Sequence, residues 1–122
     1  METADARETI YGLIREARGD RLGGMSVYST FLEAHRNADD DQAAALVQAL
    51  AEIVESDSGE MLIVGAWLAG TIALENLVSD YLELAVRRRL MELERVADQL
   101  AERDRHALDA LRRADAAIAA AQ

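Results

Sequence analysis

The sequence contains no cysteine, no proline and no lysine, and it has few aromatic residues: one tryptophan, one phenylalanine and three tyrosines. Without cysteine, disulfides, thiolate zinc sites and a cysteine nucleophile are excluded. Without proline, the chain lacks the residue that most strongly disrupts a helix interior, which favours a structure made almost wholly of helix. With 51% hydrophobic and 30% charged residues among 122, the composition is that of one globular domain.

Negative charge is in large excess. The chain has 23 acidic residues against 13 arginines, and its formal net charge is −10 with neutral histidines. A surface of this sign repels phosphates, so we expect no direct nucleic-acid binding. The one basic cluster, Arg87 to Arg89, does not form a single patch, because neighbouring residues on a helix point about 100° apart.

Long hydrophobic runs are also absent. The longest stretch without a charge covers residues 61–74, which is shorter than the roughly 20 residues needed to span a bilayer. We therefore expect a central helix surrounded by protein, and a membrane location is not expected. Residues 1–18 carry charges throughout and lack the apolar core of a signal peptide, so the sequence predicts a cytoplasmic protein.

Residues 1–59 predict three short amphipathic helices. Capping residues are expected at their starts: Asp5 with Glu8, then Ser26, then the acidic run 39–41. Gly19 and Asn37 are expected to end the first and second helices. The apolar side chains recur at helical spacing, as Ile10, Leu13, Ile14 and Ala17, then Tyr28, Phe31, Leu32 and His35, then Leu46, Ala49, Leu50, Ile53 and Val54.

Residues 60–122 predict one very long helix. Asp57 and Glu60 have the spacing of a capping box, and Gly65 and Gly70 are the only breakers we recognise after it. The segment is expected to be either continuous or made of two nearly collinear helices with a break within 87–90. The predicted fold is thus all-α, with three short helices packed on a long C-terminal helix whose regions are an apolar part, 60–86, and a charged part, 87–122.

Two patterns on this segment predict helix contacts. Gly65, Ala69 and Ala73 recur every four residues, with Gly70 beside them, and small residues at that spacing let another helix approach closely. Trp67 lies next to this face. In the charged part, a heptad pattern predicts a coiled-coil tail; its members are Leu90, Leu93, Ala97, Leu100, Asp104, Ala107, Leu111, Ala114, Ile118 and Ala121.

Residues able to perform chemistry are sparse. His35 falls on an apolar stripe, where a hydrogen-bonded core histidine is the expected role. His106 follows Glu102 by four residues, but two ligands on one exposed helix face are weak evidence for a metal. The spacings of a zinc protease, a phosphate-binding glycine loop and a nucleophile elbow are missing. We expect no cofactor, no metal and no enzymatic activity.

The functional expectation is a non-enzymatic assembly or adaptor protein. Some 60 residues of helix would extend about 90 Å, more than three short helices can cover, so a second chain is expected to cover the rest. Self-association or binding of a partner helix through the long helix follows, as in a virion or connector component. The alternative is a small acidic inhibitor whose carboxylates imitate a nucleic-acid backbone.

Overall fold

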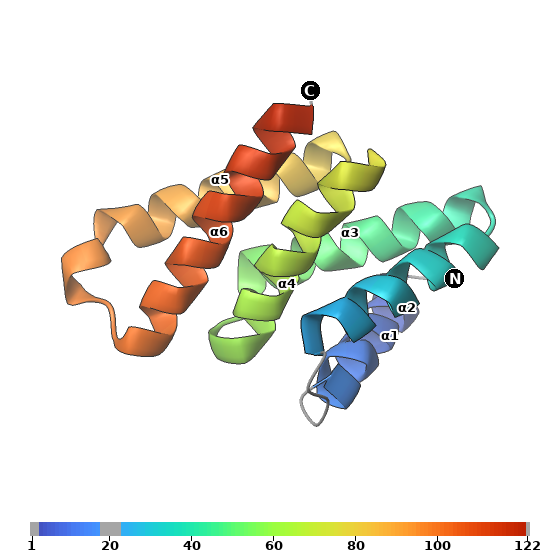
Figure 1. The fold of residues 1–122 in the computed structure, drawn as a ribbon, viewed down its shortest axis with the longest axis horizontal. Coiled ribbons are helices and arrows are strands. Elements are labelled where there is room, and N and C mark those ends of the chain that lie inside the picture. Colours follow the sequence, from blue (N-terminus) through green and yellow to red (C-terminus); the bar gives the residue numbers. More distant parts are fainter. Residues whose placement is uncertain (1–2, 18–22, 122) are drawn as a thin grey trace.

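The chain folds into packed α-helices. The computed structural model describes residues 3–17 and 23–121, and Figure 1 shows the helices in chain order. They are α1 (Thr3–Ala17), α2 (Gly23–Asn37), α3 (Asp40–Ser56), α4 (Gly59–Ile72), α5 (Asp80–Arg95) and α6 (Glu102–Ala121), with short 3-10 turns at Ala73–Glu75 and Ala97–Gln99. The all-α fold class is confirmed.

Helix α4 occupies the middle of the molecule. It packs against α6 on one side and against α1, α2 and α3 on the other, while α5 lies on α3 and α6 (Figure 1). Buried side chains from every helix form one core, with Phe31, Leu50, Leu68, Leu82 and Leu111 among its largest fully buried members. Within the described ranges, no helix is both long enough and apolar enough to cross a membrane.

The predicted long C-terminal helix is wrong, because the chain turns back twice after residue 60. The first turn follows α4, where Asn76 adopts a left-handed conformation with φ of 58° and closes the 3-10 turn. Ser79 then starts α5 by accepting a hydrogen bond from the backbone N–H of Leu82 at 3.1 Å. Asparagine tolerates the left-handed region and serine caps helices well, so two polar residues end one helix and begin the next.

The second turn lies at Val96–Ala101, not at the predicted 87–90. Arg87, Arg88 and Arg89 are all inside α5. The bidentate ion pair between Arg112 and Glu94 joins the end of α5 to α6, with N–O distances of 2.9 and 3.1 Å, and it lowers the pKa of Glu94. The predicted heptad pattern is thus divided between two helices, and a coiled-coil tail is not formed.

Some of the predicted helix ends are confirmed and others are wrong. Asp39 is the N-cap of α3 and forms a capping box with Gln42, and α2 ends at Asn37 as expected. Helices α1 and α2 begin before Asp5 and Ser26, so neither residue is a cap. The predicted box at Asp57 is also wrong, because the N-cap of α4 is Ser58 and its side chain makes no capping hydrogen bond. The expected stop at Gly19 lies outside the described residues.

Candidate binding groove between α4 and α6

Small residues bring α4 and α6 unusually close together. A Cβ atom added to Gly70 would lie 3.0 Å from the Cα of Ala114 and 3.4 Å from its Cβ. The backbones therefore meet where Gly70 faces Ala114. Because small residues leave no side chain between the two helices, their outer flanks form the sides of a groove rather than closing over it.

This groove has a volume of about 730 Å³ and is open to solvent. We call it the α4/α6 groove. Its lining is mostly apolar: Ile63, Val64, Ala66, Trp67, Gly70 and Leu74 on the α4 side, and Ala110, Ala114 and Ala117 on α6, with Glu60, Thr71, His106, Asp109 and Arg113 as polar members. The volume falls within the range of ordinary ligand sites, roughly 300–1,000 Å³.

Trp67 forms one wall of the groove. It is half-buried and meets Tyr28 of α2 edge to face, with ring centroids 6.4 Å apart and an interplanar angle of 87°. The Tyr28 hydroxyl donates to Glu75 at 2.9 Å, and this hydrogen bond raises the pKa of Tyr28. Farther along, Leu74 is 76% exposed. A large aromatic ring and a leucine thus face a surface that no part of the described chain covers.

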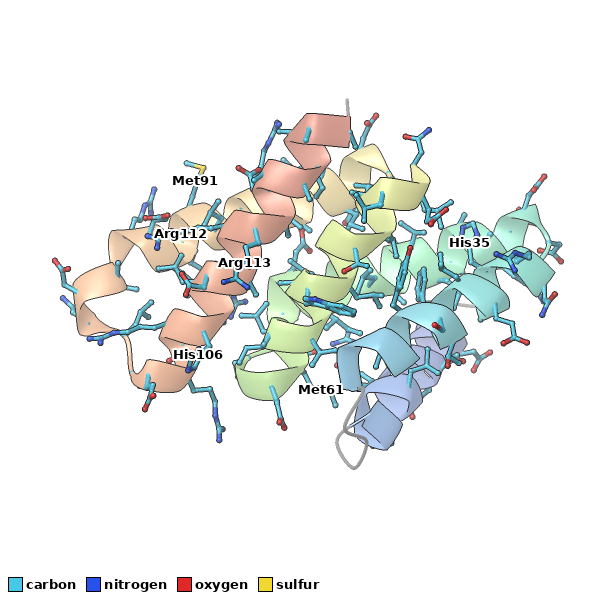
Figure 2. The ribbon with its side chains drawn as sticks, in the orientation of Figure 1. His35, Met61, Met91, His106, Arg112 and Arg113 are labelled. Carbon is cyan, nitrogen blue, oxygen red and sulfur yellow. The ribbon has the colours of Figure 1, made fainter. Side chains whose placement is uncertain are left out.

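Polar side chains of α6 mark the rim of the groove. Figure 2 labels His106 and Arg113, which lie about two turns apart on this helix. Asp109 forms its ion pair with Arg112, at 3.8 Å, rather than with Arg113. Glu102 and His106 approach to 4.0 Å, but both are largely exposed, and the described residues contain no group of three potential metal ligands. The rim can supply charge to a ligand while the floor supplies apolar area.

The sequence-predicted contact residues are spread over several places. Gly65 faces α3, where an added Cβ would lie 3.0 Å from a methyl carbon of Ile53, whereas Gly70 faces α6. Of the others, Ala69, Ala73, Leu111 and Ile118 are buried in the core, and Leu90, Leu93 and Leu100 are half-buried. Only Trp67 and Gly70 of the predicted set line the α4/α6 groove.

Most residues of the groove were not predicted. Ile63, Val64, Ala110 and Ala117 belong to it, although the heptad pattern had included only Ala114 from the α6 lining. For the α4 residues, the sequence offered one indication: they are apolar and flank the small residues of that helix. The partner helix could not be identified, because recognising it requires knowing that α6 folds back along α4.

Outside the groove, a cluster of polar side chains joins α1 to the turn between α3 and α4. The Tyr11 hydroxyl donates to Asp57 at 2.5 Å and accepts from Arg7 at 3.0 and 3.2 Å, and Arg7 lies within 3.8 Å of Glu52. Burial raises the pKa of Tyr11, and the hydrogen bond to Asp57 adds to that effect. Each polar group is thus engaged by another protein group, which indicates a structural tie.

Comparisons with protein-family models, with curated proteins and with solved structures find no match for this chain. Its function must therefore be inferred from its own residues.

Proposed function

We propose that this chain is a non-enzymatic interaction protein that binds an amphipathic helix of another protein molecule in the α4/α6 groove. The observation that carries the proposal is the groove itself, an open apolar trough about 730 Å³ in volume with charged residues at its rim. Amphipathic helices recognise such grooves by inserting side chains at i, i+3 or i+4, and i+7. The proposal keeps an assembly or adaptor role and gives it a different surface.

A different surface is proposed because the heptad residues on α6 are packed inside the molecule. Ala107, Leu111, Ala114 and Ile118 are at most 3% exposed within a single copy. They therefore offer no apolar stripe to a second chain. Trp67 and Leu74 remain accessible along the groove, and an exposed apolar surface of this kind is typical of a protein contact site.

The groove favours binding over catalysis. Its ionisable side chains lie at the rim. The most extensively hydrogen-bonded group, the Arg7–Tyr11–Asp57 cluster, lies on α1 and in the turn after α3, outside the groove lining. The acidic-inhibitor alternative has less support. Asp39 acts as a helix cap, and Glu83 and Asp115 pair with Arg87, so these carboxylates have structural partners.

Trp67 provides the test, since it is the only tryptophan in the chain and lines the groove. A designed helical peptide of about 18 residues, or five turns, with leucines on one face is titrated against the protein, beside a scrambled peptide of equal composition. We expect a saturable blue shift of Trp67 emission with the designed peptide only. Equal responses to both peptides would contradict the proposal.

Matched variants locate the binding. Ala110→Glu places a carboxylate in the groove and should lower the affinity for the designed peptide by at least about tenfold, or about 1.4 kcal/mol. Ala119→Glu adds the same charge at an exposed position of α6 outside the groove and should bind like the unmodified protein. If the two variants bind equally, the groove is not the binding site.

A further inference from the structure

A second apolar surface lies on α5. Tyr81, Leu84 and Met91 are 49%, 44% and 62% exposed, and their spacing puts them on one face of the helix. We call these three residues the α5 stripe. Among the described residues, the other exposed large hydrophobic side chains are Leu74, in the α4/α6 groove, and Val96, just after α5. The molecule therefore has one concave and one convex apolar surface.

We infer that the α5 stripe of one copy occupies the α4/α6 groove of a second copy. This inference rests on the proposed function and names its partner. The dimensions agree: the stripe extends over eleven residues, about 15 Å, and the α6 lining from His106 to Ala117 extends over twelve, about 16.5 Å. A helix face and a trough of equal length can bury each other along their whole extent.

Charge supports a second copy as the occupant. With a net charge of −10, two copies repel unless opposite charges meet locally. Arg88 and Arg95 lie on the same face of α5 as the stripe, and neither forms an ion pair within the described ranges. The groove presents Asp109, whose side chain is 64% exposed, at its rim. Docking would bring the two arginines near this carboxylate, which shares the rim with Arg113.

The proposed contact is head to tail. In Figure 2, Met91 projects outward from α5, whereas Arg113 lies between α6 and α4, so the stripe and the groove face different sides of the molecule. One copy can then use its groove and its stripe at once. Contacts of this kind generate a ring when the rotation between copies closes and a filament when it does not.

Complementary variants test this geometry. Met91→Glu should inactivate the stripe, and Ala110→Glu should inactivate the groove. For each variant alone, the self-association constant measured by sedimentation velocity should fall by at least about tenfold. Because each variant keeps the surface that the other lacks, their mixture should form a one-to-one dimer that grows no further. Ala44→Glu, at an exposed position of α3, should assemble like the unmodified chain.

Other outcomes would overturn the inference. They are an unmodified chain that stays monomeric at the highest soluble concentration, a mixture of the two variants that remains monomeric, or Met91→Glu protein that still assembles. Leu84→Glu provides a second stripe variant, and circular dichroism checks that each variant is folded. If the leucine peptide binds Met91→Glu protein while the unmodified chain stays monomeric, only the second-copy inference fails; if the peptide fails as well, so does the proposed function.

Discussion

Glycines at two positions of this chain have opposite surroundings. Gly70 is packed against the backbone of α6, with an added Cβ only 3.0 Å from the Cα of Ala114. Gly12, in α1, has nothing within 4 Å of the same position. Both are helical, so a larger residue gains helix propensity at either site. Only at Gly70 does the neighbouring helix oppose it.

We expect Gly70→Val to destabilise the protein by about 1–3 kcal/mol, because overpacking must push α6 away from α4. Gly12→Ala should stabilise it by up to about 1 kcal/mol through helix propensity alone. Urea unfolding followed by circular dichroism measures both. Equal effects of the two substitutions would mean that the close α4–α6 contact does not contribute to stability.

Tyr11 couples stability to alkaline pH. Burial and the hydrogen bond to Asp57 hold its folded-state pKa above the ordinary value of 10.0, although Arg7 acts in the opposite direction. The unfolded chain therefore loses this proton first. The contribution of Tyr11 to stability is fully present below pH 10 and is lost as the pH rises through the folded-state pKa.

Replacing Tyr11 by Phe should lower stability at neutral pH by about 1 kcal/mol, through the lost hydrogen bonds, and flatten the decline above pH 10. The measurement is the urea midpoint as a function of pH. Tyr28→Phe is the comparison, since Tyr28 also has a raised pKa, mainly through its hydrogen bond to Glu75. An unchanged alkaline decline in the Tyr11 variant would remove this residue from the explanation.

At the scale of elements, the turn between α4 and α5 changes the direction of the chain after the most hydrophobic helix. Asn76, with φ of 58°, is the only non-glycine residue of the described chain with positive φ. Glycine adopts this conformation freely, whereas a β-branched residue is strained there. The turn from α4 to α5 thus contains one residue whose backbone conformation disfavours β-branched side chains.

Asn76→Gly should leave stability within about 0.5 kcal/mol of the original, whereas Asn76→Val should cost about 1–2 kcal/mol. Thermal unfolding of both variants measures the difference. If valine is tolerated as well as glycine, the left-handed conformation is not required at this turn.

Sequence analysis predicted the helix faces well and the turns after α4 and α5 poorly. The apolar stripe of α3 was predicted, and Leu46, Ala49, Leu50, Ile53 and Val54 are all buried. Helical periodicity identifies such faces because it is local. The breaks after α4 and α5 were missed because they contain neither proline nor glycine, and one depends on a single asparagine conformation. The groove lining was mostly missed for the same reason, since it depends on how α6 returns.

For the whole molecule, net charge is the dominant long-range term. Because the chain carries −10, repulsion among its carboxylates opposes the compact state, while individual surface ion pairs such as Glu94–Arg112 each add little. Added salt weakens both, but the repulsion acts over longer distances and should be weakened more.

We therefore expect the melting temperature to rise as salt is increased from about 0.01 M to 1 M, which shortens the screening length from about 30 Å to about 3 Å. Calorimetry at neutral pH measures the shift. The shift should shrink near pH 4.5, where the chain carries little net charge. A melting temperature that falls with salt would mean that favourable ion pairs outweigh the repulsion.

The contact between Gly70 and Ala114 joins residues that are synthesised at different times. The 29 residues 73–101 separate the end of α4 from the start of α6, so translation takes on the order of seconds to proceed from one to the other. During that interval the apolar flank of α4 has no covering helix. Until α6 has left the ribosome, the most hydrophobic helix of the chain therefore lacks the helix that covers this flank, and chaperones can bind it there.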